Sequence, residues 1–200
     1  MTGLYRIRQS PWWRVARYLL LGTLAFLPAV VFLRFAQWEG TVSDERWMLA
    51  FQVALPFALG YLIAAVVRGT PSNRLVLATN LYLLGGGVMS FFHYWEGLAW
   101  YGQLREAAVM WIVVVVGIAA TLFTRAGFIA VRSTNTQMIR RDSLILMVAA
   151  CMGLTVAYVG RGNPFVAVVL PMMLMSLLGH TLRSAYNDSR GNQEALDEQA

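Results

Sequence analysis

The chemically richest part of the chain is the stretch 91–101, FFHYWEGLAWY, which follows three glycines. It contains His93, one of only two histidines, together with Glu96 and six aromatic side chains. Trp and Tyr have an apolar body and a polar edge, so they suit both binding surfaces and the membrane–water boundary. The role of the stretch therefore depends on the element that carries it.

Elsewhere the sequence lacks the patterns that accompany catalysis. There is no HExxH, GxSxG or Walker lysine motif, and Cys151 is the single cysteine. His93 and His180 fall at opposite ends of apolar segments and are expected on opposite faces of a membrane, where they cannot share a metal. We predict that the protein is not an enzyme and has no catalytic residues, no metal ligands and no cofactor.

The elements that must position these residues are apolar helices. The chain is 58% hydrophobic and only 13% charged, and its apolar residues form blocks long enough to cross a bilayer as helices. The sequence predicts an all-α integral membrane bundle of six transmembrane helices, at residues 18–36, 47–67, 75–93, 107–124, 144–160 and 164–182. Residues 1–186 would form a single transmembrane domain, followed by a polar, disordered cytoplasmic tail at 187–200.

Arginine predicts the orientation of these helices. With the N-terminus inside, only Arg34, Arg46, Arg105 and Arg161 fall in outer segments, and the other twelve basic residues fall in inner ones. This is a positive-inside bias, and with six spans it places both termini in the cytoplasm. The basic excess lies beside apolar blocks and not on a polar face, so nucleic acid is not an expected partner.

Two interpretations of the segment 93–106 remain open. It can be an aromatic belt that anchors the third helix at the outer interface. It can also be a short interfacial helix that caps the bundle, with Phe92, Trp95, Ala99 and Gly102 on one face and Glu96, Trp100 and Gln103 on another. In the second interpretation the candidate residues for contact with a partner or a lipid are Trp95, Glu96, Trp100, Tyr101 and Arg105.

Small and polar residues within the spans predict how the helices pack. Gly85, Gly86 and Gly87 should allow close approach of another helix, although a helix break that opens a substrate site is the alternative. Gln52 and Asn80 are expected to hydrogen-bond between helices. Prolines inside the spans predict helix kinks at Pro28, Pro56 and Pro171.

Over about residues 50–130 the chain resembles the intracellular septation protein A family of small polytopic inner-membrane proteins. The resemblance rests on Gly86-Gly87, then SFFH at 90–93, a basic residue at Arg105 and TRAGFI at 124–129. It implies a multi-pass protein of the bacterial inner membrane with a role in cell-envelope biogenesis or septation. It supplies no catalytic residues.

Two functions follow from these observations. The first is a non-enzymatic membrane protein that acts through membrane lipids, other membrane proteins or self-association, and it includes a subunit of a larger complex. The alternative is a carrier or channel for a small neutral or amphiphilic solute, because the middle of every predicted span lacks Asp, Glu and Arg.

Overall fold

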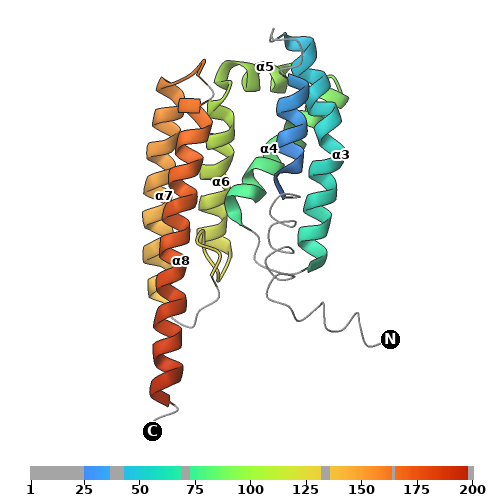
Figure 1. Cartoon of the computed structure of the whole chain (residues 1–200). Coiled ribbons are helices and arrows are strands. Elements are labelled where there is room, and N and C mark those ends of the chain that lie inside the picture. The colour runs from blue at the N-terminus through green and yellow to red at the C-terminus, as the bar shows by residue number, and fades with distance from the viewer. Residues whose placement is uncertain (1–24, 37–42, 69–72, 132–135, 164, 198–200) are drawn as a thin grey trace, which may run out of the picture. The chain divides into compact units, whose positions relative to one another are not determined.

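The computed structural model describes residues 25–36, 43–68, 73–131, 136–163 and 165–197, and within them it is all-α, with no strand. A helix at Ala25–Ala36 comes first. The elements that follow it are α3 (Asp44–Arg68), α4 (Arg74–Phe91), α5 (Trp95–Leu104), α6 (Ala107–Phe123), α7 (Thr136–Val159), the π-helix η1 (Phe165–Val169) and α8 (Leu170–Asp197) (Figure 1).

Four of these helices are long and apolar enough to cross a membrane, namely α3, α4, α7 and the helix Phe165–Tyr186. A fifth span is obtained if α5 and α6, which meet at a bend of 100°, are counted together. Part of the predicted first span lies outside the described residues, and Ala25–Ala36 is its described end. The prediction of long apolar helices is therefore confirmed, and four to five of the described segments could cross a membrane by length and composition.

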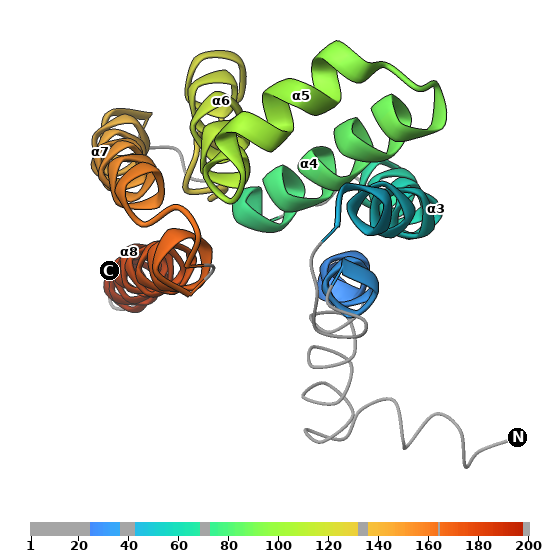
Figure 2. The ribbon, with the colours of Figure 1, turned by 90° about the horizontal axis from the view of Figure 1, so that it is seen from above.

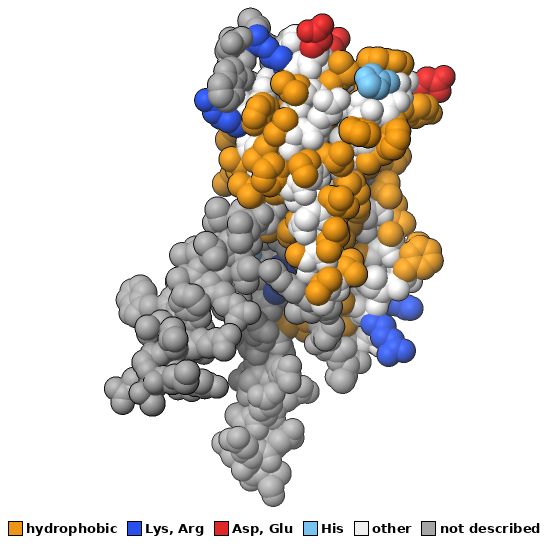
Figure 3. Space-filling model, turned by 90° about the vertical axis from the view of Figure 1, so that its right-hand side faces the viewer, with side chains coloured by type: hydrophobic (Ala, Val, Ile, Leu, Met, Phe, Trp, Pro, Cys, Tyr) orange, Lys and Arg blue, Asp and Glu red, His pale blue; other side chains and the backbone are white. Residues whose placement is uncertain are grey.

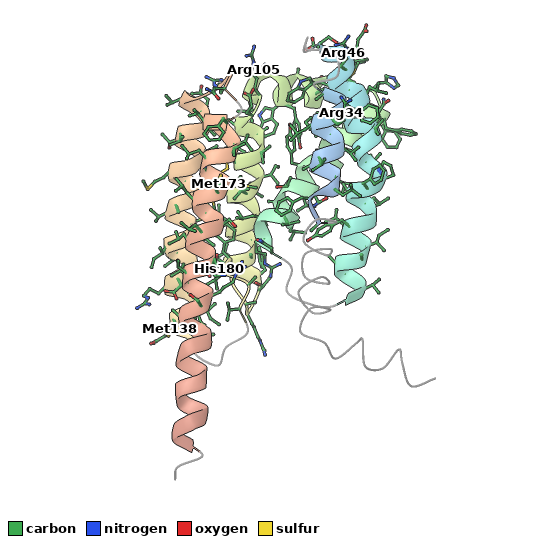
Figure 4. All side chains as sticks on the ribbon, viewed as in Figure 1. Arg34, Arg46, Arg105, Met138, Met173 and His180 are labelled. Carbon is green, nitrogen blue, oxygen red and sulfur yellow. The ribbon has the colours of Figure 1, made fainter. Side chains whose placement is uncertain are left out.

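The helices fall into two compact units. Unit 1 comprises Met1–Arg68 with Leu83–Trp95, and unit 2 comprises Gly69–Tyr82 with Glu96–Ala200. In unit 1, α3 packs against the second half of α4, and Phe51 of α3 touches the rings of Phe32 and Trp47. Arg34 and Arg46 lie at the same end of this unit (Figure 4).

Unit 2 is a bundle in which α6, α7 and α8 run side by side (Figures 1 and 2). Its core is made of small and apolar side chains, including Met110, Val113, Phe128 and Ala150, all fully buried. A Cβ added at Gly153 of α7 would lie 2.8 Å from Met110 Cε. Absence of that carbon therefore lets α7 approach its neighbours closely.

Large apolar side chains also cover the outside of the helices. Val66, Phe123 and Val159 are each at least 80% exposed, and Figure 3 shows hydrophobic side chains over the middle of the visible face. Soluble monomers rarely expose so much contiguous apolar surface. These surfaces are compatible with contact to lipid in a multi-pass membrane protein.

Several element ends differ from those predicted. Helix α7 begins at Thr136, two turns before its apolar block, because the amphipathic segment that contains Asp142 continues the helix. At the C-terminus α8 continues to Asp197, beyond the predicted end of the last span at residue 182. The last residues of α8 include Glu194, Ala195 and Leu196, which are good helix formers.

Candidate functional site

The candidate site is the corner where α5 meets α6. Only Arg105 and Glu106 separate the two helices, and the chain turns by 100° there. Arg105 has φ of 47°, a conformation that few residues other than glycine adopt. Its N–H still donates to the carbonyl of Tyr101 at 2.8 Å, so α5 ends in a hydrogen-bonded turn. The corner is a defined structure that carries Arg105 at one end of unit 2 (Figure 4).

One face of α5 is fixed to unit 2 by aromatic packing. Tyr101 is 5% exposed, and its ring stacks on Tyr82 with centroids 5.1 Å apart and planes 8° from parallel. Leu98 and Leu104 lie on the same face and are half-buried. The sequence favours Tyr101 as a partner-contact residue, but in the structure it is a packing residue with almost no free surface.

The other faces of α5 are open. Trp100 is 43% exposed, and Glu96 and Arg105 are exposed as well. Trp95, the first residue of the helix, is 58% exposed and has its ring 5.8 Å from that of His93. Both faces that the sequence proposes are therefore accessible, since the buried face lies on the opposite side of the helix.

A residue far away in the sequence holds the corner from the side. Arg161, in the turn after α7, donates from Nη1 to the carbonyl of Gln103 at 3.3 Å, and its guanidinium lies 3.8 Å from the ring centroid of Tyr158. Next to it, Gly162 N–H donates to Glu106 Oε2 at 3.3 Å. From the sequence Arg161 is only an outer basic residue, because no local pattern links it to Gln103, 58 positions earlier.

The glycine segment of α4 packs against α3 within unit 1. A Cβ added at Gly86 would lie less than 3.0 Å from three ring atoms of Phe51, and one at Gly87 would collide with Leu55. Gly85, the third glycine, is half-buried. The helix is continuous through all three residues, so the structure shows close packing here and not a helix break.

Polar side chains join the same two helices. Gln52 Nε2 donates to the carbonyl of Ser90 at 3.4 Å, and Ser90 Oγ donates to the carbonyl of Met48 at 3.0 Å. Asn80 behaves differently from Gln52. It is buried, and its Nδ2 donates to the carbonyl of Val76 in its own helix at 2.9 Å.

The prolines occupy three different settings. Pro28 is fully buried, whereas Pro56 is an exposed residue inside α3, which continues past it. Pro171 is buried at the point where the π-helix η1 gives way to α8. A proline cannot donate the i→i−4 hydrogen bond, and a π-turn before it changes the backbone register at that point.

The segment 124–131 has a structure that the sequence did not reveal. The sequence predicts only a connection between the spans 107–124 and 144–160 here, but Phe128 and Ile129 are fully buried. The N–H of Phe128 donates to Ser143 Oγ at 3.0 Å, and Gly127 has φ of +60°. Arg183 of α8 donates to the carbonyl of Ile129 at 2.9 Å. The turn is therefore held from both α7 and α8.

No protein-family model, curated protein or solved structure matches this chain. The functional assignment thus rests on the residues and their geometry. Among the described residues no group of three or more His, Cys, Asp or Glu side chains is placed to hold a metal ion.

Proposed function

We propose that the protein is a non-enzymatic, multi-pass protein of the bacterial inner membrane that recognises another membrane protein through α5. The observation that carries the proposal is the two-sided character of this helix. Tyr101 fixes one side by stacking on Tyr82, and Trp100, Glu96 and Arg105 remain exposed on a helix that turns by 100° from α6.

Exposed Trp and Arg side chains are typical of the residues that dominate binding energy at interfaces. A side chain that is already positioned loses less conformational entropy when a partner binds. The contacts of Tyr101 and Arg161 hold α5 in place and so position the exposed side chains that it carries. A simple aromatic belt needs no such fixation, because anchoring depends on the summed partitioning of its rings.

In this proposal the chain has six spans and both termini in the cytoplasm, and α5 lies at the outer surface. The distribution of arginine supports this orientation. The apolar helix at Ala25–Ala36, which covers the second part of the predicted span 18–36, supports the first of the six spans. The resemblance to the septation family suggests a partner in cell-envelope biogenesis or septation.

Cysteine labelling tests the topology in whole cells. Cys151→Ser removes the native thiol, and single cysteines then replace Ser43, Gln103 or Gln137, all of which are exposed. The first two should react with a membrane-impermeant reagent from outside and the third should not. Labelling of Gln137→Cys without labelling of Gln103→Cys would reverse the proposed orientation.

Site-specific photo-crosslinking tests recognition at α5. A photoreactive amino acid at position 100 should trap one defined membrane protein, and Arg105→Gln should reduce the yield at that position. Phe165 is the matched control, because it is an aromatic residue of unit 2 with 60% exposure outside α5. The same photoreactive residue placed there should trap lipid only.

Growth rescue of a deletion strain provides the functional measurement. Trp100→Ala should lose rescue at unchanged expression, whereas Phe165→Ala should retain it. Equal behaviour of the two variants would mean that α5 is only an anchor. Uptake of a neutral solute into proteoliposomes that survives Trp100→Ala would favour the carrier or channel instead.

A further inference from the structure

A second surface of unit 2 lies at the end of α6 that is remote from α5. Here the last turn of α6, the turn at 125–127 and the first two turns of α7 enclose a groove of about 190 Å³. We call it the basic groove. Its polar lining includes Thr124, Arg125, Thr136, Arg140 and Ser143.

The charge of the groove is positive. Arg125 and Arg140 both line it, and none of the described residues that line it is a carboxylate. The nearest carboxylate in sequence, Asp142, is 3% exposed and accepts a hydrogen bond from Arg141 Nε at 3.0 Å. Asp142 is thus paired with the adjacent arginine, which does not line the groove.

The floor of the groove is polar and fixed. Ser143 is fully buried, and its Oγ accepts the N–H of Phe128 at 3.0 Å. Gly127 approaches Ser143 so closely that an added Cβ would collide with Oγ. This contact ties the turn that carries Arg125 to the helix that carries Arg140.

The remaining wall of the groove is apolar and exposed. Leu122 and Phe123, the last residues of α6, line it and are 70% and 85% exposed. A free inorganic anion would use only the arginines and the hydroxyl groups. A molecule with a charged head and apolar chains would use both walls, with its chains leaving the groove along Leu122 and Phe123.

We propose that the basic groove binds the headgroup of an anionic phospholipid, with its phosphate held by Arg125 and Arg140. Guanidinium groups bind phosphate oxygens through two parallel hydrogen bonds, and this geometry makes arginine effective at such sites. The proposal goes beyond the recognition role of α5 and concerns a different end of unit 2.

Ordinary attraction to an anionic membrane gives a different expectation. It contributes about 1 kcal/mol for each basic residue near the surface, whichever way the side chain points. Arg140 and Arg141 are neighbours with the same charge, so simple attraction should treat them alike. A groove lined by Arg140 and not by Arg141 should distinguish them.

The test uses the full chain in a neutral detergent, with binding of phosphatidylglycerol measured by native mass spectrometry. Arg125→Gln and Arg140→Gln should each weaken binding roughly tenfold or more, from loss of a charge-assisted hydrogen bond. Arg141→Gln is the matched control and should change it by less than about threefold. Phosphatidylcholine, which has no net charge, should bind weakly to every form.

Two further arms make the result decisive. Arg140→Lys keeps the charge but not the fork of donors, so it should weaken binding by about threefold or more, while simple attraction predicts no loss. Glycerol 3-phosphate, which has the phosphate without the chains, should not compete with the lipid at equal concentration.

Three results would each overturn the proposal. The first is an equal loss of lipid binding in Arg140→Gln and Arg141→Gln, and the second is unchanged binding in Arg140→Lys. The third is full competition by glycerol 3-phosphate. Melting temperatures measured without lipid show whether a variant has lost binding because it has lost its fold. Arg141→Gln leaves Asp142 without its arginine partner and could unfold the protein for that reason. In that case the comparison of Arg140→Lys with the native chain still distinguishes binding in the basic groove from simple attraction to an anionic surface.

Discussion

Replacement of Gly86 by alanine should disturb the contact between α3 and α4 in a measurable way. The new methyl group would lie less than 3.0 Å from three ring atoms of Phe51, closer than real Cβ contacts. The ring has little room to move, because it is 2% exposed and lies 4.6 Å from the ring of Phe32 and 5.9 Å from that of Trp47. Overpacking of this kind costs about 1–3 kcal/mol.

Gly60 in α3 provides the control, since a Cβ added there meets no atom within 4 Å. Alanine stabilises a helix relative to glycine by up to about 1 kcal/mol, and that gain applies to both positions. The difference in unfolding free energy between Gly86→Ala and Gly60→Ala should therefore equal the overpacking cost, about 1–3 kcal/mol. The structure places Gly60 on an open surface.

Reversible unfolding by SDS in mixed micelles would measure both variants. Phe51→Leu then completes a double-mutant cycle, because it removes the ring that the new methyl group meets. The two substitutions should be coupled by about 1 kcal/mol or more, with Phe51→Leu less harmful in the Gly86→Ala background. Equal stability of Gly60→Ala and Gly86→Ala, together with strict additivity of the cycle, would refute the reasoning.

Two other regions give further predictions. Gly127→Ala should destabilise the purified protein by about 1–3 kcal/mol, because φ at this residue is +60° and the new methyl group meets Ser143 Oγ. Thermal unfolding would measure the loss, and an unchanged melting temperature would mean that the turn relaxes without cost. Arg161→Ala should speed amide hydrogen exchange at the end of α5 near Gln103 several-fold, because the contact that holds this end is lost, and Arg34→Ala in unit 1 is its control.

The sequence by itself determined the class of the protein and the position of most helices. Long apolar blocks leave the backbone no hydrogen-bonding partner in lipid except itself, so composition alone specifies helices there. A separate short helix within 93–106 was one of the two interpretations from the sequence, and the structure has such a helix, α5, at Trp95–Leu104.

Only the tertiary structure decided what each residue at these positions touches. Tyr101 and Trp100 are neighbours of similar character, yet one stacks on Tyr82 and the other is 43% exposed. Gly60 and Gly86 both lie inside apolar helices, and only Gly86 has a ring against it. Such contacts depend on the rotation of each helix about its axis and on partners dozens of residues away. A nearly uniform apolar sequence predicts neither the rotation nor the partners.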